Sequence, residues 1–178
     1  MAVKTVFLFA CLAVGATRWV SAQAVRKSQH GSVTQRVANT DVTIAYNRPV
    51  ARGRELFGPT VPYGKEWDPG ADEATTIAFS TDVLFGGVHL PAGKYSVWVV
   101  PMERGPWTFI LSTAADVFHT PYPAGKDALR IPATPQRGPH METLAFYFPV
   151  VDADSAVLSL HWGTTVLSIP IKAGSAPR

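Results

Sequence analysis

Charged and aromatic side chains that could bind a polar ligand are concentrated between residues 48 and 73. Guanidinium groups offer fork-shaped pairs of donors to anions, and tyrosine and tryptophan rings give flat faces on which a sugar can stack. Acidic side chains in the same stretch can accept hydrogen bonds from hydroxyl groups. We therefore take as candidate ligand-binding residues Arg52, Arg54, Tyr63, Trp67, Asp68 and Asp72.

Two more charges in this stretch are predicted to pair with each other. Arg48 continues the apolar face formed by residues 42, 44 and 46, and Glu73 continues backwards the apolar face formed by residues 75, 77 and 79. An unpaired charge on a buried face costs several kcal/mol, so we expect Arg48 and Glu73 to form an internal ion pair that holds the intervening loop on the sheet. The substitution Glu73→Gln would then strongly destabilise the fold.

Catalysis by carboxylates is an alternative use of the same region. Asp68, Asp72 and Glu73 lie close together in the chain, and two acids at a suitable separation can act as acid and base in hydrolysis. No serine sits in a Gly-x-Ser-x-Gly elbow, so the sequence does not indicate a nucleophilic serine, and no catalytic residue is assigned.

Histidines and acids elsewhere give weaker signals. His140 and Glu142 would project from one face of a strand, and a metal would need a third ligand such as His119 or Asp127. The sequence has no His-x-His, no HExxH and no cysteine pair, so we expect no metal and no cofactor. Asp127 and Arg130 are expected to form an ion pair. His161 alternates with the leucines around it and is expected to be exposed or to face a ligand, with simple exposure the favoured alternative.

The elements that must position these residues are short strands. Alternating apolar runs recur along the chain, separated by Gly, Pro, Asn and Asp, and no stretch has helical periodicity. This pattern predicts an all-β fold, an antiparallel β-sandwich of about ten short strands. Gly and Pro are so frequent between residues 49 and 70 that this part should be a long irregular loop packed on the sandwich.

Turn signals predict how neighbouring strands connect. Asn39-Thr40 should join strands at 33–38 and 41–48, and Gly86-Gly87 should join strands at 82–85 and 88–90. Gly163-Thr164 should join strands at 156–162 and 165–171 as a hairpin. Further strands are expected at 74–80, 95–100, 107–111, 128–131 and 142–148.

The N-terminal segment resembles a secretory signal. It has a positive start at Lys4, an apolar run over 6–16 that is too short to span a bilayer, and small residues before Ala22, with cleavage after Ala24 nearly as suitable. We therefore expect a signal peptide at 1–22, a flexible lead-in at 23–32, a single domain at 33–172 and a tail at 173–178. The protein should be exported to the periplasm or beyond, with no membrane span after cleavage.

Processing would also change the composition. The single cysteine, Cys11, would be lost, so stability must come from packing rather than disulfides. Of 16 lysines and arginines, Lys4 and Arg18 would also leave, and the remaining 14 face 13 acids, a net charge of +1. There is no cluster of basic residues, so nucleic-acid binding is not expected.

Several motifs in the chain resemble the family of exported bacterial proteins known as domain of unknown function 2911. The matching motifs are Tyr46-Asn47-Arg48-Pro49, Gly53-Arg54, Leu56-Phe57-Gly58, Val61-Pro62-Tyr63-Gly64, Trp67, Gly70-Ala71, Glu73-Ala74-Thr75-Thr76-Ile77, Leu90-Pro91-Ala92-Gly93-Lys94-Tyr95, Trp107-Thr108, Tyr122 and Asp127-Ala128-Leu129-Arg130. Departures occur at Asp68-Pro69, where the family pattern has Arg-Thr, and at Asp72, where it has Asn. The resemblance implies export and carries no activity.

These observations favour a binding function over catalysis. The leading interpretation is a non-catalytic module that binds a small polar ligand, a glycan or a partner protein through the loop between residues 48 and 73. A carboxylate-dependent hydrolase that uses the Asp68, Asp72 and Glu73 region is the first alternative. The second is a structural module that assembles through its sheet edges, which would need a long unprotected edge strand.

Overall fold

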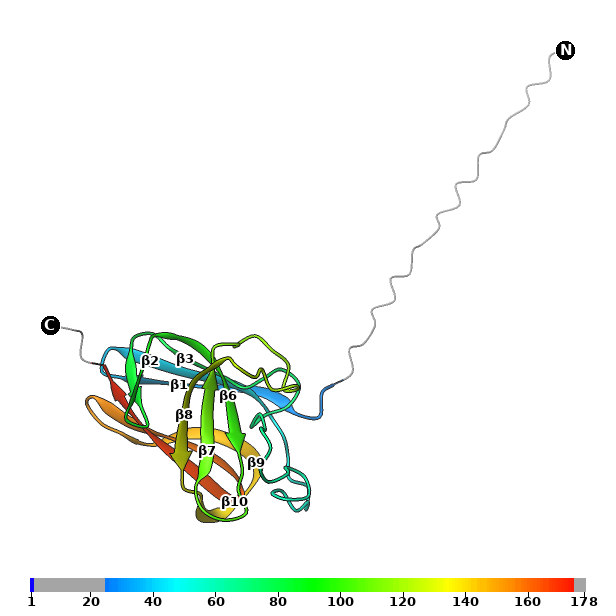
Figure 1. The fold of residues 1–178 in the computed structure, drawn as a ribbon. Coiled ribbons are helices and arrows are strands. Elements are labelled where there is room, and N and C mark those ends of the chain that lie inside the picture. The colour runs from blue at the N-terminus through cyan, green and yellow to red at the C-terminus, as the bar shows by residue number, and fades with distance from the viewer. Residues whose placement is uncertain (2–24, 175–178) are drawn as a thin grey trace.

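Alternating apolar residues form two antiparallel sheets in the computed structural model, which describes residue 1 and residues 25–174 (Figure 1). The strands are β1 (Gln29–Val37), β2 (Thr40–Arg48), β3 (Thr76–Phe79), β4 (Val83–Phe85), β5 (Val88–Leu90), β6 (Gly93–Val100), β7 (Trp107–Ser112), β8 (Asp127–Ala133), β9 (Gln136–Val151) and β10 (Ser155–Ala173). One sheet has the order β1-β2-β3-β6-β7-β8 and the other β5-β4-β10-β9. The prediction of an antiparallel β-sandwich is confirmed.

The core lies between the two sheets. The inward residues of β2 alternate with half-buried ones, and Val42 and Ile44 are fully buried. They pack with the inward faces of β6, β7 and β10 in a single apolar cluster that also takes in Leu56 and Val61 from the loop after β2. Burial of these side chains supplies the main driving force for folding.

The β1–β2 hairpin forms with its turn one residue earlier than the predicted Asn39-Thr40, and the β4–β5 hairpin is confirmed. The first turns at Ala38-Asn39, with Val37 opposite Thr40 and a positive φ of 50° at Ala38. The second turns at Gly86-Gly87, where both glycines have a positive φ. Strand β1 begins at Gln29, so the expected flexible lead-in is wrong for residues 29–32, which pair with the end of β2. The expected signal peptide lies outside the described residues.

The hairpin predicted at Gly163-Thr164 is wrong. Strand β10 runs through this position without turning, and its pairing with β9 shifts register on both sides of Gly163. Gly163 has a φ of 58°, a conformation that glycine adopts without steric cost, and here it forms a β-bulge rather than a turn. Strand β10 therefore pairs with β9 and with β4 and belongs to one sheet along its whole length.

Two long loops pack on the sandwich. The loop between β2 and β3 follows one end of the sandwich (Figure 1), and its backbone pairs with β9, with Ala51 N–H donating to Glu142 O and Leu144 N–H to Pro49 O. The loop between β7 and β8 covers the outer face of the six-stranded sheet, where Tyr122 packs edge-on against Trp98.

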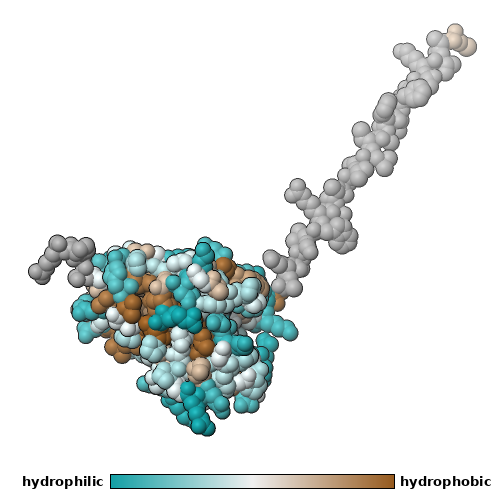
Figure 2. All heavy atoms as spheres, in the orientation of Figure 1, coloured by the Kyte–Doolittle hydropathy of each residue, from teal (hydrophilic) through white to brown (hydrophobic). Residues whose placement is uncertain are grey.

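The surface outside these loops is mixed. Hydrophilic and apolar residues alternate over the face shown in Figure 2, and hydrophilic residues dominate its lower end. Within the part of the chain that the structure describes, no helix is long and apolar enough to cross a membrane.

Candidate ligand-binding cleft

Arg48 and Glu73 do not pair, and the predicted internal ion pair is wrong. Arg48 Nε donates to the Leu144 carbonyl at 3.1 Å, whereas Glu73 accepts a hydrogen bond from Asn47 Nδ2 at 2.9 Å and forms an ion pair with Arg26. The side chain of Glu73 is 59% exposed. The alternation of β3 does not extend back to Glu73, because the strand starts at Thr76 and Glu73 instead forms an isolated bridge with Phe118.

Replacing Glu73 should therefore have little effect on stability. The ion pair with Arg26 lowers the pKa of Glu73 to about 2, so its contribution is present above its ordinary pKa and is lost only as the pH falls towards 2. Both partners are exposed, and exposed ion pairs contribute little. We expect Glu73→Gln to leave the melting temperature at pH 7 nearly unchanged in a thermal melt. A fall of many degrees would show that Glu73 stabilises the fold as strongly as the predicted buried pair with Arg48 would have.

Asp68 is buried rather than available to a ligand. The residue is 3% exposed, its Oδ2 accepts the Thr75 backbone N–H at 2.8 Å, and among the described residues no arginine or lysine forms an ion pair with it. Burial raises the pKa of this carboxyl group to about 8. Asp68 therefore connects the loop to the residue before β3 and has no path to a ligand.

Asp72 and Arg52 also make contacts that hold the loop in place, and neither lines the cleft described below. The Asp72 carbonyl accepts the backbone N–H of His119 at 2.9 Å and faces its Nδ1 at 2.7 Å, and its carboxylate lies 3.8 Å from Arg26. The Arg52 N–H donates to Glu142 Oε1 at 2.6 Å, and its backbone has a positive φ of 53°. The structure thus separates Asp68, Asp72 and Arg52 from the other candidates.

Trp67 is part of an aromatic cluster centred on Phe57. Its ring stacks on Trp162 at 5.9 Å between centroids with an interplanar angle of 16°. Phe57 meets Trp67, Trp107 and Trp162 edge-on, at 5.8, 4.7 and 6.4 Å. Such edge-to-face contacts add to the energy of burial. The loop is therefore fixed to the end of the sandwich by an aromatic side chain.

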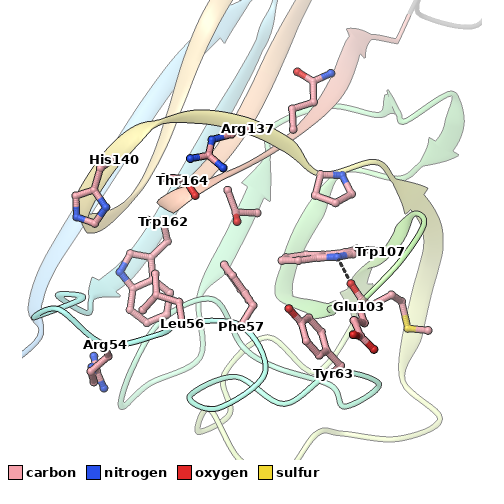
Figure 3. Close-up of a pocket in the computed structure, with 15 residues that line it drawn as sticks. Arg54, Leu56, Phe57, Tyr63, Glu103, Trp107, Arg137, His140, Trp162 and Thr164 are labelled. Atoms are coloured by element: carbon pink, nitrogen blue, oxygen red, sulfur yellow. Dashed lines mark hydrogen bonds between the residues drawn. The ribbon is translucent and has the colours of Figure 1, made fainter.

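Arg54 and Tyr63 border a cleft of about 500 Å³ next to this cluster (Figure 3). The loop after β2 forms one wall, the β6–β7 turn a second, the start of β9 a third, and the bulge of β10 a fourth. Its lining comprises Arg54, Leu56, Phe57, Tyr63, Met102, Glu103, Trp107, Pro135, Gln136, Arg137, His140, Trp162, Gly163, Thr164 and Thr165. A volume of this size is typical of small-molecule sites.

The cleft has a polar rim over an aromatic base. Phe57, Trp107 and Trp162 belong to the cluster below. Apart from Met102, the exposed residues of the lining are polar: Arg54, Tyr63, Glu103, Gln136, Arg137, His140 and Thr164. Trp107 Nε1 donates to the Met102 carbonyl at 2.8 Å, which holds the β6–β7 turn that carries Glu103. The side chains of Arg137 and Glu103 make no hydrogen bond or ion pair within the described residues, so both are free to bind a ligand.

A protein-family model matches the part of the chain that contains the cleft. The model of a protein of unknown function, DUF2911, matches residues 28–171. The chain belongs to the DUF2911 family. No curated protein and no solved structure matches it. All the residues that line the cleft fall within residues 28–171, so the cleft lies within the DUF2911 domain of this chain.

The other predicted side-chain arrangements have structural roles in this DUF2911 domain. His140 Nε2 lies 2.9 Å from Glu142 Oε2 and lowers the pKa of that carboxyl group. Arg130 pairs with Asp127 at 2.8 Å, as expected. Among residues 25–174, no group of three or more His, Cys, Asp or Glu side chains is placed to hold a metal ion.

His161 is buried, and the prediction that it is exposed is wrong. It is 2% exposed, and its Nε2 lies 2.9 Å from the Pro139 carbonyl. The start of β9 bends over this face of β10, and the histidine ring packs against Gly138. Both faces of β10 are therefore covered near the bulge.

Sequence reasoning missed the residues that complete the cleft, chiefly Glu103, Arg137 and Thr164. Arg137 lies between the strands predicted at 128–131 and 142–148, and Thr164 lies in the predicted turn at Gly163-Thr164. One available signal was the pair Leu56-Phe57, because large apolar residues within a Gly- and Pro-rich loop indicate that the loop is packed on the core. That signal locates the loop but not the walls that face it.

Proposed function

We propose that this DUF2911 domain is an exported, non-catalytic binding module that holds a small polar ligand, a glycan among the candidates, in the cleft beside Phe57. The observation that carries the proposal is the convergence of four separate segments on one cleft whose exposed polar side chains surround an aromatic base. Sites for small molecules combine an apolar lining with a few placed polar groups in this way.

Binding fits the charges of the cleft better than hydrolysis does. Within the described residues the lining contains a single acid, Glu103, whereas hydrolysis of a glycosidic bond uses two facing carboxyl groups. The acids first considered for catalysis lie elsewhere: Asp68 is buried and Glu73 is paired with Arg26. This distribution supports a binding module.

The proposal predicts that the affinity of the cleft for its ligand depends on Tyr63. Tyr63 is 40% exposed at the edge of the cleft. Its ring therefore offers a stacking face and contributes little to the apolar core. We expect Tyr63→Ala to weaken a bound ligand by about tenfold while the fold remains intact. The measurement is a thermal-shift screen of the protein against neutral and charged sugars, cell-wall fragments, carboxylates and phosphorylated metabolites, followed by calorimetric titration of each ligand that binds.

Phe118→Ala provides the matched control. Phe118 is also an exposed aromatic residue, but it lines a separate groove of about 460 Å³ between the β7–β8 loop and Glu73. Ligands that lose affinity in Tyr63→Ala and retain it in Phe118→Ala bind in the cleft. The reverse pattern would move the site to the second groove, and the absence of binding by every class would overturn the proposal.

A further inference from the structure

The cleft carries one uncompensated positive charge. Arg54 and Arg137 are the arginines in its lining, Glu103 is the acid, and His140 is paired with Glu142 just outside it. Within the lining, two guanidinium groups against one carboxylate leave a net charge of +1, with His140 counted as neutral and Glu142 lying outside the lining. A ligand of charge −1 would balance the cleft, and a dianion would exceed it.

The donors available in the cleft match a planar acceptor. Arg54 uses Nε to donate to the Ala51 carbonyl at 2.9 Å and Nη2 to donate to the Val50 carbonyl at 2.7 Å. These bonds fix the plane of the guanidinium and leave three of its five N–H groups unused. Arg137 has no such partners within the described residues. Figure 3 shows its guanidinium above the aromatic base, beside Thr164. A carboxylate accepts two parallel N–H bonds from such a group.

An unsatisfied buried donor lies in the same wall. Trp162 is 3% exposed, and its Nε1 is the buried side-chain polar atom in the described residues that has no hydrogen-bond partner. In Figure 3 this nitrogen lies on the side of the ring towards Arg54 and His140. A buried donor without an acceptor is costly, and native proteins rarely leave one. An acceptor oxygen that reached it after a small movement of Leu56, drawn beside the ring, would remove that cost.

We propose that the ligand of this cleft carries one carboxylate group, which Arg137 holds while the rest of the ligand, a sugar ring for example, rests against Tyr63. The inference rests on the proposed function and specifies its ligand class. Glu103, across the cleft, is left to accept hydrogen bonds from hydroxyl groups of the ligand.

Three hexoses that differ at one carbon test the proposal. Glucose, glucuronate and glucose 6-phosphate present a hydroxymethyl group, a carboxylate and a phosphate on the same ring. In calorimetric titrations of the protein, glucuronate should bind at least about tenfold more tightly than glucose, and the phosphate should bind no more tightly than the carboxylate. For any other acid that the library screen finds, the matched comparison is its primary amide.

Variants assign the effect to the cleft. Arg137→Gln should lower the affinity for glucuronate, or for the acid found by the screen, to that of its neutral counterpart, while binding of the neutral compound is unchanged. Arg36→Gln, which removes an equal charge from the β1–β2 hairpin, should change neither. A loss of affinity in Arg36→Gln equal to that in Arg137→Gln would show a general charge effect and overturn the assignment.

The outcomes separate the two proposals. Equal binding of acids and their neutral counterparts, or tighter binding of the phosphate, overturns the carboxylate inference and leaves the binding function in place. Ligands that depend on Tyr63 but not on Arg137 do the same. If no compound of any class binds, the proposed function itself fails.

Discussion

Asp68→Asn should raise the melting temperature at pH 8 by about 5–10 °C and should flatten the loss of stability between pH 5 and pH 8. Asp68 is buried and accepts the Thr75 N–H, and within the described residues no cation pairs with it. The charged form is therefore disfavoured in the folded protein, and burial raises the pKa of Asp68 to about 8.

The direction of the pH dependence follows from the two pKa values. In the unfolded chain an aspartate titrates near pH 4, and in the folded protein Asp68 titrates near pH 8. Below pH 4 the group is protonated in both states, and its contribution to stability is fully present. Between pH 4 and pH 8 the unfolded chain releases the proton while the folded protein keeps it, so the free energy of unfolding falls as the pH rises. This difference amounts to several kcal/mol across the interval.

Asparagine matches the protonated acid in shape and in hydrogen bonding. Its carbonyl oxygen can accept the Thr75 N–H in place of Asp68 Oδ2. The Thr75 hydroxyl donates its only proton to the Pro69 carbonyl at 3.1 Å, so towards Asp68 Oδ1, at 3.5 Å, it acts as an acceptor when the acid is protonated. The amide N–H₂ of asparagine supplies a donor at that position, and it does not ionise.

Thermal melts of the wild type and Asp68→Asn at several pH values between 4 and 9 provide the test. Glu66→Gln is the control, because Glu66 is exposed, lies two residues away and also loses one negative charge. It should shift the curve little and leave its slope unchanged. Parallel curves for the wild type and Asp68→Asn would mean that Asp68 is ionised in the folded protein.

The sandwich was predictable from sequence because its signals are local. Alternation in β2 and β7 and the Gly86-Gly87 turn depend only on residues next to each other in the chain, and each led to the correct element. The prediction failed where one local signal has two structural meanings. Gly163 supplies a positive φ in either a hairpin turn or a bulge, and the pairing of β10 with β9 and β4 decides between them.

The candidate site was predictable only in part, because it is formed by distant segments. Arg54 and Tyr63 were chosen for their residue types, and the structure places both at the cleft. Glu73 was assigned to a buried face by extending the alternation of β3 to a residue before the strand begins at Thr76, whereas the backbone of Glu73 forms an isolated bridge with Phe118, a distant contact that the sequence does not reveal. Arg137 reaches the cleft because β9 starts opposite the bulge of β10, with Arg137 paired with Thr165. That register is a property of the folded sheet.

Trp67→Ala should destabilise the protein by about 3 kcal/mol or more and lower its melting temperature by roughly 6–12 °C. The sequence suggested Trp67 as a stacking face for a ligand. In the structure its ring is stacked on Trp162 and meets Phe57 edge-on, and it is absent from the lining of the cleft. Its removal would leave a cavity beneath two residues that do line the cleft, because neither Trp162 nor Phe57 can fill the space without leaving its other contacts.

Two variants separate a role in the core from a role in binding. Trp67→Phe keeps an aromatic ring and should recover part of the lost stability, whereas Tyr63→Ala should melt close to the wild type because Tyr63 is 40% exposed and lies outside the apolar core cluster. Thermal melts of the three variants, with calorimetric titration of one cleft ligand, give the comparison. If Trp67→Ala melted like the wild type yet lost the ligand, Trp67 would contact the ligand directly. If it melts early, its weaker binding follows from a disordered base beneath Phe57, and the ligand contacts are those of Tyr63 and Arg137.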